Sequence, residues 1–171
     1  MNAPPEERSS VLRAASYLRV AHGELDLSAA LAREAIEIAS AVGCYWVHAY
    51  ALLALGFRAQ AAGEMDEEAS CYEEGLAVAR NVPAPLPFQV STLLQCLAEV
   101  AFRAGDLDRA ESLCLEALAV LEPFGERYGA GFILRTLGWV RHHKGDTVGA
   151  LDAWFKAFQA SREVDDRKSV V

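Results

Sequence analysis

A short motif recurs four times along this chain at almost constant spacing. Each copy opens with a glycine, and these glycines are Gly23, Gly63, Gly105 and Gly145. The steps between them are 40, 42 and 40 residues. A period between about 20 and 50 residues is typical of proteins in which one supersecondary unit is repeated and stacked. The spacing therefore constrains the fold more than any other feature, and it predicts an array of four units.

Each motif has the composition of a turn between two helices. Glycine readily adopts the left-handed backbone that ends many helices, and acids that follow it can accept hydrogen bonds from the free amides of the next helix. The acids are Glu24, Glu64, Asp106 and Asp146, followed in three copies by Asp26, Asp66 and Asp108. An apolar residue separates the two acids in those three copies. We expect this residue to staple the turn to the core and the second acid to cap the helix.

Apolar residues at helical spacing predict two helices for each motif. The expected helices cover residues 9–22, 26–41, 45–62, 66–80, 87–103, 108–121, 127–143 and 147–162. Residues 1–8 are expected to form a disordered leader. Residues 9–164 are predicted to form one solenoid domain, with repeats at about 9–42, 43–82, 83–124 and 125–164. The proline-rich stretch at 82–87 is interpreted as a loop between repeats, with Pro87 at a first helical position.

The last residues, 165–171, are predicted to begin a further repeat or to form a tail. They align with the stretch that opens the fourth helix pair, since Val164 and Asp165 take the places of Phe124 and Gly125. Solenoids normally end in a polar capping helix, and the sequence shows none here. We therefore expect the chain to be a piece of a longer array.

Charge and composition exclude several classes of function. The formal net charge of −8 argues against nucleic acid as a direct partner, because neutralising phosphates requires an excess of Lys and Arg. Residues 38–57 contain no Asp, Glu, Lys or Arg, but they include Ser40, Gly43 and His48 and cross a repeat junction, so we interpret them as buried rather than membrane-spanning. The four cysteines have no metal-ligand spacing and are expected to be reduced core thiols of a cytoplasmic protein.

No catalytic, cofactor-binding or metal-binding arrangement is found. His142 and His143 are adjacent, so on a helix they point about 100 degrees apart and cannot share a metal as an i, i+4 pair could. Gly125, Gly129 and Gly131 do not open a strand–loop–helix unit, so they are not a phosphate-binding loop. We therefore predict a protein that is not an enzyme and holds no cofactor.

Small and large residues in the third and fourth copies resemble the tetratricopeptide repeat consensus. The matching positions are Leu94, Leu97, Ala98, Gly105, Ala110 and Ala117, and then Leu134, Leu137, Gly138, Gly145, Ala150, Trp154 and Ala157. The resemblance implies an all-α, right-handed superhelical solenoid of four antiparallel helix pairs. The period is longer than the common 34 residues of the family. In this respect the chain is similar to the repeat regions of bacterial LuxR-type and maltose-regulator-like ATPase regulators, where the repeats serve as a sensor and docking arm.

The resemblance implies that the first helix of each pair lines a concave groove. On the last of these helices, Phe132, Arg135, Trp139 and His142 recur at steps of three and four and so share one face. The predicted partner-binding residues are Arg13, Tyr17, Tyr50, Phe57, Glu99, Arg103, Phe132, Arg135, Trp139 and His142. Leu53 belongs to the same series by spacing. Aromatic residues with scattered arginines suit an extended peptide or a helix, although such aromatics can also simply cover neighbouring helices.

Two functions remain open at this stage. The first is a protein–protein interaction module that binds a peptide or partner domain, within a larger bacterial regulatory protein. The alternative is an effector-sensing arm in which a small molecule binds inside the superhelix. A continuous groove would favour the first, and a closed pocket with convergent polar groups would favour the second. Uncapped repeat ends could also allow self-association.

Overall fold

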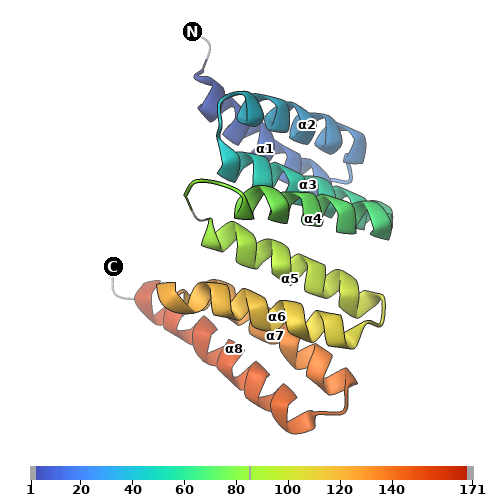
Figure 1. Cartoon of the computed structure of the whole chain (residues 1–171), viewed down its shortest axis with the longest axis vertical. Helices are drawn as coiled ribbons and strands as arrows, with labels where there is room; N and C mark the ends of the chain where they lie inside the picture. The colour runs from blue at the N-terminus through green and yellow to red at the C-terminus, as the bar shows by residue number, and fades with distance from the viewer. Residues whose placement is uncertain (1–2, 85, 169–171) are drawn as a thin grey trace. The chain divides into compact units, whose positions relative to one another are not determined.

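The described part of the chain is entirely helical. A computed structural model describes residues 3–84 and 86–168, apart from the side chains of Tyr128 and residues 163–168. The helices, labelled in Figure 1, are α1 (Pro5–Ala21), α2 (Leu25–Ala41), α3 (Tyr45–Ala62), α4 (Met65–Arg80), α5 (Pro87–Arg103), α6 (Leu107–Leu121), the 3-10 turn η1 (Glu122–Phe124), α7 (Arg127–His143) and α8 (Thr147–Lys168). This order confirms the predicted all-α fold of paired helices.

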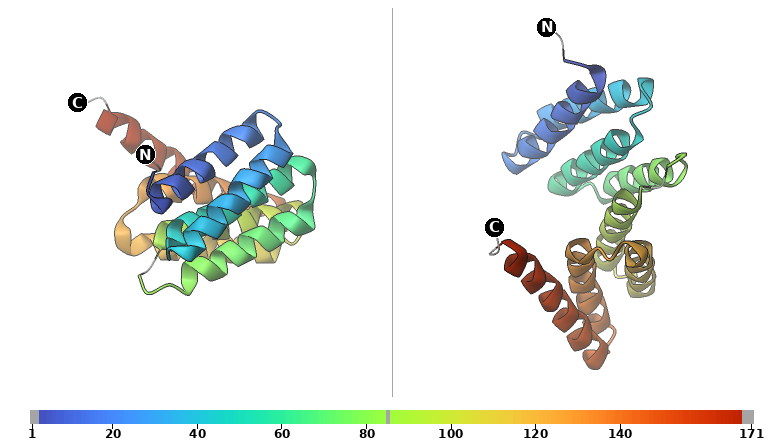
Figure 2. Two further views of the ribbon diagram at one scale, coloured as in Figure 1. Left: turned by 90° about the horizontal axis from the view of Figure 1, so that it is seen from above. Right: turned by 90° about the vertical axis from the view of Figure 1, so that its left-hand side faces the viewer.

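The helices form two compact units, which are described separately. In the first unit, residues 1–89, α1 packs on α2, α3 packs on α4, and α3 also contacts both helices of the first pair. In the second unit, residues 90–171, α7 packs on both α6 and α8. Figure 2 shows the pairing within each unit from two further directions. The expectation of a single continuous domain at 9–164 stays a prediction.

The two ends of the chain differ from the sequence-based expectation. Helix α1 begins at Pro5, inside the expected leader of residues 1–8, because proline suits a first helical position and Glu6 and Glu7 favour a helix N-terminus. Residues 1–2 and 169–171 lie outside the described residues. Helix α8 continues to Lys168 through the expected junction after residue 164. At the aligned junction Gly125 has a φ of 59°, whereas position 165 is an aspartate and the helix does not end there.

The four motif glycines form the predicted joints within helix pairs. Gly23, Gly63, Gly105 and Gly145 have φ values of 75°, 78°, 82° and 83°, in the left-handed region that favours glycine. The helix that follows begins one residue earlier than expected, at Leu25, Met65 and Leu107 in the first three copies. The expectation that the second acid caps the helix is therefore wrong, because that acid already lies in the first turn.

The first acid of each motif occupies the capping position. The length of its side chain decides whether it caps the helix or forms an ion pair. The Asp106 carboxylate accepts a hydrogen bond from the Arg109 amide at 3.1 Å, and Asp146 accepts one from Gly149 at 2.9 Å. Neither Glu24 nor Glu64 makes a side-chain cap. Their longer side chains pair with arginines of the preceding helix instead, Glu24 with Arg19 and Glu64 with Arg58.

Small residues let the paired helices approach closely. On α2, Ala32, Ala35 and Ala39 are fully buried. In the second pair, a Cβ atom added at Gly56 would lie 2.1 Å from Cε1 of Tyr72, a ring that is only 1% exposed. In the fourth pair, a Cβ at Gly138 would lie 2.2 Å from Nε1 of Trp154. The predicted facing of Gly56 and Tyr72 is thereby confirmed.

The uncharged stretch at residues 38–57 is the end of α2, a turn and most of α3. Helix α3 buries nine of its residues, among them Leu52, Leu53 and Leu55, which accounts for its lack of charge. Among the described residues, no helix is long and apolar enough to cross a membrane. All four cysteines are free, and Cys96 and Cys114 are buried. Burial raises the pKa of the Cys114 thiol to about 12, so this thiol is a packing group rather than a nucleophile.

A network of ion pairs joins α6 to the end of α7. The Glu111 carboxylate accepts from Nε of Arg141 at 3.0 Å and from Nζ of Lys144 at 2.7 Å. Lys144 also pairs with Asp108 at 2.6 Å. Hydrogen bonds from Lys144 and then Arg141 lower the pKa of the Glu111 carboxyl, and those to Asp108 and Glu111 raise the pKa of Lys144 to about 12. The network holds neighbouring repeats of the second unit together by charge.

We expect Glu111→Gln to lower the free energy of unfolding at pH 7 by about 1 kcal/mol or less, the usual size for a largely solvated pair. Because the folded-state pKa of Glu111 lies below its ordinary value of 4.5, its contribution is fully present above that value and is lost as the pH falls below it. Urea unfolding should therefore show a smaller difference between wild type and variant at pH 3.5 than at pH 7. Glu37→Gln, at an exposed position of α2, is the control, and an equal difference at both pH values would contradict the prediction.

Candidate functional site

The predicted stripe on α7 is exposed in the structure. Phe132 is 41% exposed and Trp139 is 49% exposed, and Arg135 and His142 also reach solvent. Another face of the same helix is buried, and its residues Ile133, Leu137 and Val140 belong to the core. The side chains of the stripe are therefore not buried by packing within the chain, and a ligand can reach them.

Glu99 and Arg103 lie on α5, and Glu99 contacts α7 in the second unit. The Glu99 carboxylate accepts hydrogen bonds from Gln95 of its own helix and from Thr136 of α7, each at 3.2 Å. Nε of Arg103 donates to the backbone oxygen of Glu99 at 3.4 Å. Glu99 is thus tied to the neighbouring helix, which makes it a positioning group between the two helices rather than an open acceptor.

Equivalent residues of the first unit also come together. The Tyr17 ring of α1 lies 5.6 Å from the Phe57 ring of α3 in an edge-on contact. The Arg13 guanidinium lies 5.8 Å from the Tyr50 ring and 5.7 Å from the Trp46 ring. The sequence did not point to Trp46. Leu53, which the spacing also placed on the groove, is only 2% exposed and belongs to the core, so its assignment to the groove was wrong.

Two arginines of the predicted set contact aromatic rings instead of carboxylates. Arg13 contacts Trp46 and Tyr50, and Arg135 lies 5.7 Å from the Phe132 ring. Among the described residues, no carboxylate lies within ion-pair distance of either arginine. A guanidinium over an aromatic face gains a modest cation–π attraction and keeps its hydrogen-bond donors free. Both side chains can therefore bind an anionic group from outside the chain.

An aromatic cluster surrounds Trp139 in the second unit. Its ring lies 5.1 Å from that of Trp154 of α8, and 6.3 and 6.4 Å from the rings of His142 and His143. The His143 ring in turn lies 4.9 Å from Phe102 of α5. The neighbouring rings restrict the exposed indole, and packed aromatic area of this kind is common at binding hot spots.

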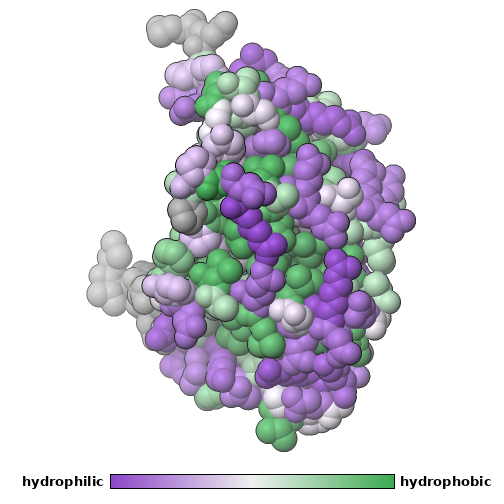
Figure 3. Space-filling model, in the orientation of Figure 1, coloured by the Kyte–Doolittle hydropathy of each residue, from purple (hydrophilic) through white to green (hydrophobic). Residues whose placement is uncertain are grey.

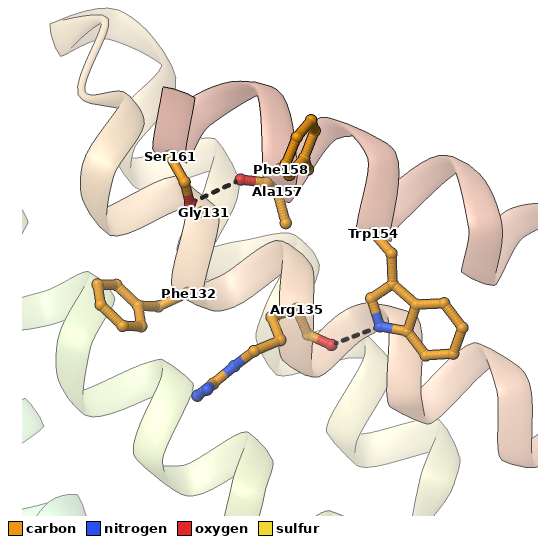
Figure 4. Close-up of a pocket in the computed structure, with 7 residues that line it drawn as sticks. All are labelled: Gly131, Phe132, Arg135, Trp154, Ala157, Phe158 and Ser161. Carbon is orange, nitrogen blue, oxygen red and sulfur yellow. Dashed lines mark hydrogen bonds between the residues drawn. The ribbon is translucent and has the colours of Figure 1, made fainter. Parts of the chain in front are cut away.

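A pocket of about 320 Å³ opens between α7 and α8, and Figure 4 shows its walls. It is lined by Gly131, Phe132, Arg135, Trp154, Ala157, Phe158 and Ser161. Two of its polar groups are already used within the fold, because the Trp154 indole donates to the Arg135 backbone oxygen at 3.2 Å and the Ser161 hydroxyl donates to that of Ala157 at 3.1 Å. The Arg135 guanidinium is the charged side chain among the lining residues.

The contribution of α8 to this pocket was not predicted. The sequence suggested Trp154 and Ala157 only as packing positions of the repeat, and it gave no role to Phe158 or Ser161. The signal was present, since residues 154, 157, 158 and 161 follow the spacing of one helix face. It was obscured because a packing stripe and a pocket wall have the same periodicity.

Apolar side chains also reach the surface elsewhere, and Figure 3 shows them among polar ones over one face of the molecule. On α8, Val148 is 80% exposed, and Leu151, Phe155 and Phe158 are each about 60% exposed. Phe155 does not line the pocket, although it has almost the same exposure as Phe158. The two phenylalanines therefore form a matched pair for experiments.

The described residues do not form a metal centre. Within the described part of the chain, no group of three His, Cys, Asp or Glu residues could hold a metal ion. The rings of His142 and His143 stand 5.6 Å apart at 89° and belong to the aromatic cluster around Trp139. The site thus offers exposed aromatic rings and guanidinium groups without carboxylate partners among the described residues, which are groups that bind ligands rather than catalyse reactions.

Comparison with known proteins identifies the repeat. The family model of the tetratricopeptide repeat matches residues 89–163. A comparison with curated protein sequences finds no significant match. A solved Rap protein, complexed with competence and sporulation factor, superposes with a TM-score of 0.83 at 14% identity, covering 97% of this chain and 46% of that one. The apo form of RapI gives 0.82 at 13% identity, covering 98% and 61%.

A Podosopora anserina protein with nearly identical TPR-like repeats also superposes, with a TM-score of 0.66 at 12% identity, covering 98% of this chain and 93% of that one. The chain spans about half to two-thirds of the two Rap-type structures. At these identities the solved structures establish the fold alone. Residues 89–163 therefore carry the sequence pattern of the tetratricopeptide repeat, and helix pairs with the same glycine joints precede them.

Proposed function

We propose that this chain is a non-catalytic interaction module that binds a peptide segment of a partner protein through the exposed face of α7 and its neighbours. The observation that carries the proposal is the exposed aromatic stripe beside arginines without carboxylate partners. Trp139 exposes half of its surface although it is held by Trp154 and His142. Rigid aromatic area and arginine are the residue types that dominate binding energy at protein interfaces.

Two further observations support a peptide over a small effector molecule. The stripe extends along α7 from Phe132 to His142, which is longer than a compact ligand requires. The pocket beside it lacks the convergent polar groups that orient a small molecule, because the donors of Trp154 and Ser161 are used within the fold. An extended chain can place one side chain in the pocket and continue along the stripe.

The binding context is proposed on the resemblance of the sequence. Long-period repeats of this kind are similar to the docking arms of bacterial transcriptional regulators, and we propose that the module belongs to such a regulatory protein. The solved Rap protein complexed with competence and sporulation factor has the same fold, which supports a ligand-binding role for the repeats. We further propose that the chain self-associates through the exposed apolar residues Val148 and Leu151 of α8, and sedimentation velocity over a range of concentrations tests this.

The binding test uses a phage-displayed library of random 12-residue peptides selected on the immobilised chain. We expect selected peptides to bind wild type and to bind Trp139→Ala at least about tenfold more weakly, because hot-spot aromatics contribute 2 kcal/mol or more. Fluorescence anisotropy with labelled peptides measures the affinities, and circular dichroism checks that helicity is kept.

Phe155→Ala is the control for Trp139→Ala, since it also removes an exposed aromatic ring from the second unit. It should leave peptide affinity unchanged. Failure to select any peptide that binds in solution would overturn the proposed function. Equal affinity for wild type and Trp139→Ala would remove the α7 stripe from the binding site. A large loss of thermal stability in Trp139→Ala would show that the indole is a core group.

A further inference from the structure

We infer that the pocket between α7 and α8 is a subsite for one apolar side chain of the bound peptide, and that Arg135 pairs with a carboxylate next to that side chain. This inference rests on the proposed function and specifies the chemistry of the partner. The occupant is a segment in which a large aliphatic or aromatic residue lies beside an aspartate or glutamate.

The shape of the pocket favours a side chain as its occupant. Its floor is made by small residues, and a Cβ placed on Gly131 would meet only ordinary contacts, 3.4 Å from Ala160 and 3.6 Å from the Ala157 oxygen. Phe132, Phe158 and Trp154, which Figure 4 labels, are its aromatic lining residues. A volume of about 320 Å³ is at the lower end of small-molecule sites and is ample for one large side chain. An apolar group placed there would cover aromatic surface that is now solvated.

The charge at the pocket specifies the second part of the ligand. Arg135 lines the pocket and contacts the Phe132 ring, and within the described residues no carboxylate pairs with it. Three other cations of this unit have carboxylate partners, since Arg141 and Lys144 pair with Glu111 and Lys156 pairs with Asp152. In a chain with a net charge of −8, an acidic segment would be repelled elsewhere, so an unpaired guanidinium beside an apolar pocket selects where it binds.

The test uses peptides selected from the random library, labelled with fluorescein and titrated against the full chain. Selected sequences should be enriched in a large apolar residue next to Asp or Glu. Phe158→Ala should weaken binding at least about tenfold, whereas Phe155→Ala, on the same helix and equally exposed, should change it less than about twofold. Both phenylalanines are solvated, so neither change should prevent folding.

A charge exchange isolates the role of Arg135. Arg135→Glu should weaken binding at least about tenfold, and replacing the acidic residue of the peptide by lysine should restore binding to this variant while weakening binding to wild type. Arg33→Glu, an equal charge change at an exposed position of α2, controls for net charge and should have little effect. A small structural role for Arg135 would not produce such a reciprocal rescue.

The outcomes separate this inference from the proposed function. If peptides bind wild type but respond equally to Phe158→Ala and Phe155→Ala, the pocket is not the subsite and the inference is overturned, while the proposed function stands. The same holds if the charge exchange gives no rescue. If no peptide binds wild type, the proposed function fails and the inference fails with it.

Discussion

Gly56→Ala is expected to destabilise the first unit by about 2 kcal/mol or more, although it adds a single methyl group. Alanine is the better helix former by about 1 kcal/mol, so the change would be favourable on an isolated helix. In the protein, the new Cβ would lie 2.1 Å from Cε1 and 2.6 Å from Cδ1 of the Tyr72 ring. Overpacking of this kind costs about 1–3 kcal/mol and sometimes more.

The Tyr72 ring has no space into which it can move. It is 1% exposed, and its centroid lies 6.0 Å from that of the Phe57 ring. The helices α3 and α4 must therefore separate, which also disturbs the buried Leu52 and Leu55. We expect the melting temperature to fall by roughly 4–8 °C, measured by circular dichroism.

Gly131→Ala provides the control for Gly56→Ala. Its new Cβ would meet Ala160 and Ala157 only at van der Waals distance, so helix propensity should dominate and stability should stay the same or rise. If Gly56→Ala were as stable as wild type, the close packing of α3 on α4 at Tyr72 would be contradicted. Equal losses of stability in Gly56→Ala and Gly131→Ala would show that the cost comes from replacing a glycine in a helix, and not from the clash with the Tyr72 ring.

The helix pairs could be predicted from the sequence because several local signals agree. The glycine of each motif, the acid after it and the apolar spacing on both sides all indicate the same boundary. In six of the eight helices, both the first and the last residue lie within one residue of the expected position. The ends of the array lack this agreement. At α1, proline and two glutamates extend the helix towards the N-terminus, and at α8 no glycine interrupts it after residue 162.

The binding face could be predicted only in part, because periodicity locates a face without showing what covers it. The spacing of Phe132, Arg135 and Trp139 placed them together on α7, and all three are exposed. The same reasoning placed Leu53 on the groove, but α4 and the first helix pair surround α3 and bury this side chain. The pocket requires α8 to pack at a particular angle on α7, and no local signal in the sequence encodes that angle.

Gly138→Ala is expected to lower both the stability of the fourth helix pair and the affinity of the pocket for peptide. The added Cβ would lie 2.2 Å from Nε1 and 2.3 Å from Cδ1 of Trp154, nearly the same clash as at Gly56. Trp154 is only partly buried, however, and its indole can turn outwards where Tyr72 cannot. The loss of stability should therefore be smaller than for Gly56→Ala, on the order of 1–2 kcal/mol, with loss of the hydrogen bond to the Arg135 oxygen.

The larger effect of Gly138→Ala should be on binding, because Trp154 forms a wall of the pocket and supports the Trp139 ring at 5.1 Å. Turning the indole changes both surfaces at once, so peptide affinity should fall at least about tenfold even though no residue of the α7 stripe has been replaced. Trp fluorescence should shift as the ring moves, and anisotropy titration measures the affinity. In Gly56→Ala, affinity measured well below its melting temperature should stay near that of wild type, because Tyr72 belongs to the other unit. If Gly138→Ala lost stability but kept full affinity, the peptide would not contact Trp154, because moving the Trp154 ring would then have had no effect on binding.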